Sequence, residues 1–403
     1  MTRRDFTKTL PALLTPGPAA LRATAAVTKL KITDIRLHNL RATREVGSLE
    51  AAWNPGTQVK FVVGGGSFVE IHTDQGLTGI GPGLDPDLLP AAKAQLVGKD
   101  PFDIEEHAAR LRYYVRGLSY RGPEGLDIAL WDLIGKVANQ PLYKLFGGGS
   151  NRITAYASMM KLSTPEERAE MAAALAGQGW RAIKLRLHHP TMKEDLRTVE
   201  RVRKAVGDHM EIMVDANQAQ SEGNWQPGIL WDFRRALETA LELQRMNVYW
   251  LEEPLPRYHF DQLAEINRQV SISLAGGENN RREQEFVEIL QRGVYDILQP
   301  ESMAAEGITG LRKIGVLAEA FGRKVVPHHG GGQLGTVAHM HLVASWRHAP
   351  YLELLHDPPI ADYRHRFAVM KDPPAVDGEG MVTVPTGPGL GVEIDPAMIA
   401  DSA

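Results

Sequence analysis

The chain has no cysteine among its 403 residues. This absence excludes a disulfide framework, a thiolate metal site and catalysis by a thiol nucleophile. The chain also lacks an excess of one charge, because 45 lysines and arginines stand against 49 aspartates and glutamates, for a net charge of −4. Such a surface does not attract nucleic acid or anionic lipid. We therefore expect the partner to be a small molecule.

No apolar run approaches the roughly 20 residues that cross a bilayer, so no membrane anchor is expected. The N-terminal segment Thr2-Arg3-Arg4-Asp5-Phe6-Thr7-Lys8 resembles the twin-arginine export signal. A weak apolar stretch follows, and Ala23-Thr24-Ala25 has the small-x-small pattern of a peptidase site. We expect residues 1–27 to be a leader that directs export to the periplasm. The alternative is a disordered basic tail on a cytoplasmic protein.

Three further segments follow this leader. Residues 28–150 place alternating, strand-like patterns before helical ones, which predicts an α+β unit. Residues 151–357 alternate strand and helix patterns and contain eight expected strands, the number found in a (β/α)8 barrel. Residues 358–403 are rich in proline, glycine and short strand-like runs, and we expect them to return to the first unit.

Seven charged or imidazole side chains stand at the ends of short apolar runs: Lys184, Asp215, Glu252, Glu278, Glu301, His328 and Glu353. Neighbours in this series lie 23 to 37 residues apart. A repeat of about 30 residues is expected when about 250 residues form eight strand–helix units. Because the C-terminal ends of barrel strands all face one cavity, these seven groups are expected to meet in a single site.

Three acids of this series, Asp215, Glu252 and Glu278, end successive strands. Oxygen ligands without a nearby histidine or cysteine favour a hard cation such as Mg²⁺. Without a cation, repulsion between three crowded carboxylates would raise their pKa values. Capping of the following helix could explain any one of these acids. It does not explain all three at the same strand end.

Several motifs resemble those of the enolase superfamily, in its mandelate racemase subgroup. They are Val214-Asp215-Ala216-Asn217-Gln218, Trp250-Leu251-Glu252-Glu253-Pro254 and Gly276-Gly277-Glu278-Asn279. The segment from Gly125 to Lys136, with Pro141-Leu142 and Leu145-Phe146-Gly147-Gly148 after it, is similar to the helix that joins that family's capping domain to its barrel. The resemblance covers nearly everything after the leader. It implies an α/β fold with a (β/α)7β TIM-like barrel and an α+β capping domain built from both termini. It also implies one essential Mg²⁺ and a homo-oligomer, either a dimer or an octamer.

In that family a base removes the proton beside the substrate carboxylate to give an enediolate. His328 matches the family's histidine base, and Glu301 stands where the family usually has an aspartate that pairs with it. Glutamate is longer by one methylene. Glu353 matches a family acid that hydrogen-bonds the substrate carboxylate. His329 is a candidate substrate contact, although a regular strand would turn it away from the cavity.

Lys184, Arg186 and His188 lie at positions i, i+2 and i+4, so a strand would place them on one side. Racemases of the family have Lys-x-Lys here, and the second lysine is a base. Arg186 replaces it, and a guanidinium with a pKa above about 12 does not accept a proton near neutrality. This favours β-elimination over two-base racemisation. The proton for the departing hydroxide could come from His328, Lys184 or His188.

Two further residues are candidate substrate contacts. Asn217 is expected to face the cavity two residues after Asp215. Trp53, within residues 48–57, together with the glycine run at 64–66, suits a mobile lid over a small polyol. The alternative for the lid is an ordinary loop.

These observations predict a Mg²⁺-dependent dehydratase of a sugar acid, either an aldonate or an aldarate. A racemase, epimerase or cycloisomerase that uses the same enediolate is the alternative enzyme. A non-catalytic binding or regulatory homologue is the alternative of another class. The three metal-binding acids and His328 together argue against a non-catalytic homologue.

Overall fold

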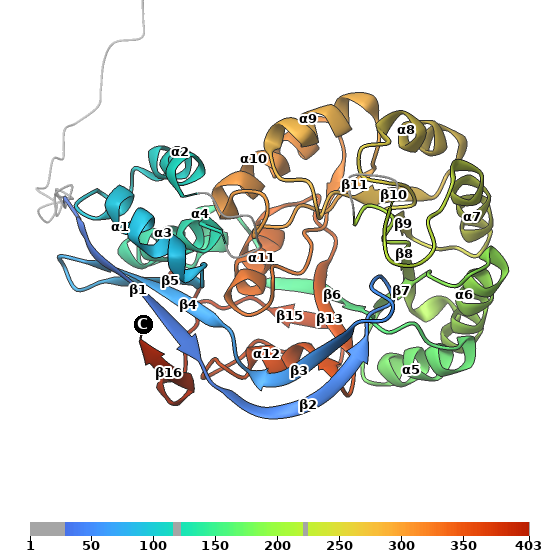
Figure 1. The fold of residues 1–403 in the computed structure, drawn as a ribbon, viewed down its shortest axis with the longest axis horizontal. Coiled ribbons are helices and arrows are strands. Elements are labelled where there is room, and N and C mark those ends of the chain that lie inside the picture. The colour runs from blue at the N-terminus through green and yellow to red at the C-terminus, as the bar shows by residue number, and fades with distance from the viewer. Residues whose placement is uncertain (1–28, 116–121, 221–224, 403) are drawn as a thin grey trace, which may run out of the picture.

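The computed structural model describes residues 29–115, 122–220 and 225–402. The expected leader therefore lies outside the described residues. Figure 1 shows a sheet with helices at one side of the molecule and a ring of helices around short strands at the other. Within the described residues, no helix is both long enough and apolar enough to cross a membrane.

The N-terminal unit is built on an antiparallel sheet in the order β16-β1-β4-β5. Its strands are β1 (Ile32–Leu40), β4 (Ser67–Thr73), β5 (Thr78–Pro82) and β16 (Ile399–Ser402). Strands β4 and β5 form a hairpin, in which Ile71 of β4 pairs with Gly79 of β5. On β1, buried Ile32, Ile35 and Leu37 face the core of this unit.

The helices of this unit are α1 (Leu89–Leu96), α2 (Ile104–Tyr114), α3 (Glu124–Val137) and the short α4 (Leu142–Leu145), with the 3-10 turn η1 (Pro86–Leu88) before α1. Helices α1 and α3 lie against the sheet, α2 packs on α1 and α3, and α4 packs on α3. Helix α3 packs directly on β5, since a Cβ at Gly81 would lie 2.1 Å from the carbonyl oxygen of Gly125. Helix α3 also joins the barrel. The indole of Trp131 donates to the hydroxyl of Thr309 at 2.8 Å.

Strands β2 (Ala42–Glu50) and β3 (Gln58–Gly64) form a two-stranded antiparallel ribbon. We expected a mobile lid or an ordinary loop at residues 48–57 and at the glycine run 64–66, and no ribbon. The ribbon gave little strand signal because most β2 side chains are exposed and show no apolar alternation. It extends along the barrel in Figure 1, and at its tip the amide of Ala52 donates to the carbonyl of Met160 at 2.9 Å. The tip carries Trp53.

The second unit confirms the predicted TIM-like barrel. Its eight consecutive strands are β6 (Arg152–Ser158), β7 (Ala182–Arg186), β8 (Glu211–Asp215), β9 (Trp250–Glu252), β10 (Ser273–Gly276), β11 (Ile297–Leu298), β12 (Lys324–Val325) and β13 (Leu352–Asp357). Each of β6 to β11 pairs in parallel with the next strand in the chain, and β13 returns to pair in parallel with β6. All eight strands therefore present their C-terminal ends on one face.

The helices that follow the first seven strands form the outer layer: α5 (Pro165–Gly177), α6 (Met192–Val206), α7 (Phe233–Arg245), α8 (Phe260–Gln269), α9 (Glu283–Arg292), α10 (Gly307–Ala320) and α11 (Leu334–Ser345). The 3-10 turn η2 (Gly207–His209) follows α6. Helix α5 begins with a capping box, in which Thr164 and Glu167 exchange side-chain and backbone hydrogen bonds. Large side chains fill the barrel interior, among them Tyr156 and Trp250 in edge-to-face contact at 5.4 Å.

The C-terminal segment contains β14 (Ala361–Asp362), α12 (Tyr363–Phe367), β15 (Met381–Thr383), η3 (Pro396–Met398) and β16. Only its last part reaches the capping sheet, where β16 pairs with β1. Strand β14 instead pairs with β13, and β15 pairs with β6. The segment from 361 to 383 therefore stays with the barrel, where β14 pairs with the last two residues of β13 and β15 pairs with the first three residues of β6.

Candidate active site

Three acidic side chains converge at the C-terminal ends of neighbouring strands. Asp215 is the last residue of β8, Glu252 is the last residue of β9, and Glu278 follows β10. All three are buried, and one oxygen from each lies within 4.8 Å of the others. This donor set fits a hard divalent cation, because it offers carboxylate oxygens only.

Lys184 lies directly beneath these acids and is fully buried. Its Nζ is 2.8 Å from a Glu252 oxygen, 2.9 Å from Glu353 and 3.6 Å from Asp215. Burial alone would lower the pKa of this lysine, but Glu252 and Glu353 raise it. Burial and the neighbouring Asp215 raise the pKa of Glu252. The negative charge of Glu252 is thus not fully stabilised by its surroundings, and a divalent ion would relieve the repulsion on it.

All three guanidinium nitrogens of Arg186 donate hydrogen bonds to the protein. Its donors reach Met159 O at 2.7 Å, Ser158 Oγ at 3.1 Å, Asn217 Oδ1 at 3.1 Å and, in direct contact, Asp215. The ring of Trp53 lies over its other face, with 4.7 Å between the guanidinium carbon and the ring centroid. Arg186 is therefore a fixed cation beside the metal-binding acids, and the capping unit covers it through Trp53.

Asn217 and His188 lie together next to Asp215. Asn217 adopts a left-handed backbone (φ 45°), so its side chain turns back and its amide donates to Asp215 at 3.0 Å. The Nε2 of His188 lies 3.1 Å from Oδ1 of Asn217. Burial lowers the pKa of His188 to about 4, which leaves this imidazole neutral near pH 7.

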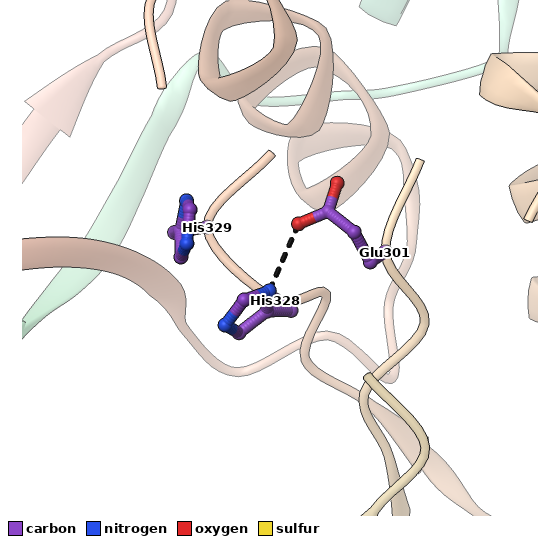
Figure 2. A group of neighbouring side chains, drawn as sticks. All are labelled: Glu301, His328 and His329. Carbon is purple, nitrogen blue, oxygen red and sulfur yellow. Dashed lines mark hydrogen bonds and ion pairs between the residues drawn. The ribbon is translucent and has the colours of Figure 1, made fainter. Parts of the chain in front are cut away.

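His328 and Glu301 form a hydrogen-bonded pair. The Nδ1 of His328 lies 2.9 Å from Oε2 of Glu301, as Figure 2 shows. Glu301 is held from its other sides by the backbone N–H groups of Gly330 and Met303, each at 2.9 Å. Burial would raise the pKa of Glu301, but its bond to His328 lowers that pKa to about 2. The longer glutamate therefore reaches the histidine at normal hydrogen-bond distance.

The pair with Glu301 directs Nε2 of His328 toward the acids, 3.2 Å from Oε2 of Glu278. Burial opposes the charged form of His328, whereas Glu278, Glu301 and Glu353 favour it and raise its pKa to about 10. Glu278 makes the largest of these favourable contributions, so a cation held by that carboxylate would offset it and lower the pKa of His328, which allows Nε2 to act as a base. The set Glu301, His328 and His329 also brings three potential ligand atoms within 4.8 Å. Because Nδ1 of His328 is already bonded to Glu301, we assign this pair to proton chemistry rather than to metal binding.

His329 does not turn away from the cavity as a regular strand would require. Strand β12 ends at Val325, so the alternation of a strand no longer applies at position 329. The two imidazole rings of His328 and His329 lie 4.1 Å apart, and Figure 2 shows His329 on the side of His328 opposite Glu301. Burial and the adjacent His328 lower the pKa of His329 to about 3, so this ring is neutral. Its Nδ1 is buried and has no hydrogen-bond partner among the described residues.

A cavity of about 340 Å³ opens over these groups, which we call the catalytic cavity. Its lining includes the expected residues Trp53, Arg186, Asn217, Glu278, Glu301, His328 and His329. Lys184 and His188 do not line it. The glycine run at 64–66 is a turn that binds Gln333, whose amide donates to Gly65 O at 2.6 Å, and does not line it either.

Sequence reasoning missed three polar residues of the site. Gln220 lines the cavity and donates to Glu278 at 3.2 Å. Gln299 donates to Glu252 at 2.7 Å, and the indole of Trp250 donates to the same oxygen at 3.2 Å. Gln299 stands two residues before Glu301 and Trp250 two residues before Glu252, so strand alternation was the available signal for both.

Comparison with known proteins assigns the family. A model described as "Enolase C-terminal domain-like" matches residues 166–398, which is more than half of the chain. A second model, described as "Mandelate racemase / muconate lactonizing enzyme, N-terminal domain", matches residues 61–147. The chain belongs to the mandelate racemase and muconate lactonizing enzyme family.

Members of this family that resemble the chain catalyse more than one reaction. The D-galactarolactone cycloisomerase of Agrobacterium fabrum is 30% identical, over 91% of this chain and 97% of its own length. The arabinonate dehydratase of Saccharolobus solfataricus is 29% identical, over 81% of this chain and 87% of its own length. The structure of D-glucarate dehydratase from Agrobacterium tumefaciens, complexed with magnesium, has a TM-score of 0.79 and 28% identity, over 92% of this chain and 98% of that one. The family assignment thus supports an enzyme that is an acid sugar dehydratase or an isomerase.

Proposed function

We propose that this protein is a Mg²⁺-dependent dehydratase of a sugar acid, an aldonate or an aldarate. One observation favours elimination over racemisation. His328, paired with Glu301, is a base on one side of the catalytic cavity. The group at the second family base position is Arg186, each of whose nitrogens donates a hydrogen bond to the protein. A guanidinium does not act as a base near neutrality. The relatives that are dehydratases support the same choice.

Each group of residues in the site has its own role in the proposed reaction. Asp215, Glu252 and Glu278 would hold Mg²⁺, which would supply positive charge to stabilise the substrate carboxylate as the α-proton leaves. Nε2 of His328 takes that α-proton, and Glu301 keeps Nδ1 protonated so that Nε2 has the free lone pair. Glu353, which pairs with Lys184 at 2.9 Å, would hydrogen-bond the substrate carboxylate in its protonated form.

The same histidine returns the proton to the leaving group. The Cα–H bond breaks to His328, and the Cβ–O bond breaks as the departing hydroxyl takes that proton and leaves as water. The enol that remains tautomerises to a 2-keto-3-deoxy acid. Lys184 is enclosed by carboxylates and His188 is bonded to Asn217, and neither lines the catalytic cavity. Elimination therefore takes place on one face of the substrate.

Five residues position the substrate in this proposal. Asn217, His329 and Trp53 line the catalytic cavity and contact its hydroxyls. Arg186 fixes Asn217, and His188 supports the same amide from behind. A small-molecule carboxylate is the only partner that the reaction needs.

Incubation with a panel of sugar acids and Mg²⁺ in D₂O tests the proposal. A keto acid should appear with the active substrate, and the His328→Asn variant should form none. Formation of α-deuterated acid without keto acid would show racemisation or epimerisation instead. Conversion of a sugar lactone without loss of water would favour cycloisomerisation, the activity of the 30% identical relative.

A further inference from the structure

A second cavity of about 300 Å³ adjoins the catalytic cavity; Glu353 lines it, but none of the three metal-binding acids does. We call it the distal cavity. The two share Trp53, His329, Gly331 and Leu355 in their walls. A substrate whose carboxylate end lies near His328 therefore extends its far end past His329 into the distal cavity.

The walls of the distal cavity are mainly apolar and come from both units. They include Val59, Phe61 and Val62 of β3, Met160 after β6, Leu355 of β13 and Phe367 of α12. These segments are far apart in sequence and meet because the ribbon β2–β3 lies against the barrel and α12. Such walls favour an apolar group, since they offer no hydrogen bonds to replace those that a hydroxyl or carboxylate makes with water.

Several polar side chains around this cavity are bonded to the protein itself. Thr336 Oγ1 donates to His329 O at 2.6 Å, and Tyr363 OH accepts from the Val376 amide at 3.0 Å. The Nδ1 of His365 lies 3.2 Å from Ile360 O. A polar group deep in the distal cavity would therefore compete with bonds that already exist.

Two polar groups in these walls differ. Both carboxylate oxygens of Glu353 are buried without a hydrogen-bond partner among the described residues, although Oε1 pairs with Lys184 at 2.9 Å. His329 stands at the boundary between the cavities. Nδ1 of His329 is buried there without a partner among the described residues. It offers a hydrogen bond to a substrate hydroxyl at the point where the polar part of the substrate ends.

We propose that the substrate is a monocarboxylic sugar acid with a deoxygenated far end, such as a 6-deoxyhexonate, rather than an aldarate. This inference rests on the proposed function for the place of the carboxylate and narrows its substrate class. The main alternative is an aldarate whose second carboxylate reaches Arg366 and His365, which also line the distal cavity.

The two substrate classes are distinguished by comparing three acids of one configuration: a hexonate, its 6-deoxy form and its hexarate. The comparison is repeated for each configuration tested. We expect kcat/KM for the 6-deoxy acid to exceed that of the hexonate about tenfold and that of the hexarate about a hundredfold or more. Dissociation constants for the same acids, measured by tryptophan fluorescence with the His328→Asn variant and Mg²⁺, should follow the same order. A hexarate that binds best or reacts fastest would overturn the inference.

Two valine variants on one strand test the cavity itself. Val62 lines the distal cavity and Val63 does not. Val62→Thr keeps the shape but adds a hydroxyl, so it should reduce the preference for the 6-deoxy acid severalfold, whereas Val63→Thr should leave that preference unchanged. Equal effects of both variants would refute the role of the cavity. Binding of the 6-deoxy acid in the expected order without keto acid in the wild type would instead refute the dehydratase proposal and leave this inference standing.

Discussion

The Nδ1 atom of His328 and the Oε2 atom of Glu301 lie 2.9 Å apart, and the Gly330 N–H donates to the same oxygen at 2.9 Å. This arrangement fixes one orientation of the imidazole and leaves Nε2 over the catalytic cavity. The ionised glutamate also stabilises the imidazolium that forms when the α-proton is taken.

Glu301→Gln should therefore lower kcat about a hundredfold, since the amide keeps the shape of the carboxylate but neither its charge nor its control of the tautomer. The measurement is keto-acid formation with the best acid of the panel. Ser302→Ala is a matched control, because it removes only the 3.3 Å bond from Ser302 Oγ to Glu301. A loss of similar size in both variants would contradict the role of the pair.

Metal binding should be visible in stability as well as in activity. Mg²⁺ at about a hundred times its dissociation constant should stabilise the folded protein by about 2.7 kcal/mol. We expect Tm to rise with Mg²⁺ and to fall with a chelator, and Glu252→Gln should abolish this response. Glu253→Gln is the control. Glu253 is buried beside Glu252, and burial raises its pKa well above the ordinary value, so an amide resembles its uncharged form. If Glu252→Gln kept the full response, the assignment of the metal site would be wrong.

Much of this site could be predicted because barrel geometry is regular. Asp215 and Glu252 end strands of predictable length, and parallel strands bring those ends together whatever the loops do. The place of His328 beside Glu301 follows from the same rule.

The remaining features of the site depend on tertiary contacts, which local sequence patterns do not indicate. His329 turns toward the cavity because β12 ends early, and Trp53 reaches Arg186 because a largely exposed ribbon docks on the barrel. The distal cavity joins β3 to Leu355 and Phe367, some 300 residues later in the chain, and only the tertiary arrangement brings them together. The sheet pairing of β14 and β15 was missed for the same reason.

We also propose that residues 1–27 direct export. In a bacterial host with a twin-arginine pathway, the protein should appear in the periplasm. The double variant Arg3→Lys/Arg4→Lys should remain in the cytoplasm, because the paired arginines are the part of the signal that is read. Arg22→Lys lies in the same segment outside the pair and should be exported normally. Wild-type protein found only in the cytoplasm would contradict the proposal.

A buried histidine far from the metal-binding acids predicts how stability depends on pH. His341 accepts the Tyr143 N–H at Nδ1 (3.2 Å) and lies 3.0 Å from Leu390 O at Nε2, so its neutral form satisfies both neighbours. Burial lowers its pKa from 6.5 to about 4. Between pH 6.5 and pH 4, His341 therefore binds a proton in the unfolded chain but not in the folded chain. The stability present above pH 6.5 is lost as the pH falls through this range.

Each pKa unit corresponds to about 1.36 kcal/mol, so wild type should lose about 2 kcal/mol more free energy of unfolding than His341→Gln between pH 7 and pH 5. The variant is suitable because glutamine accepts one bond and donates the other without titrating. Urea unfolding at the two pH values measures the difference. His209→Gln, at an exposed site, should follow wild type. If His341→Gln kept the full pH dependence, the acid sensitivity would belong to other groups.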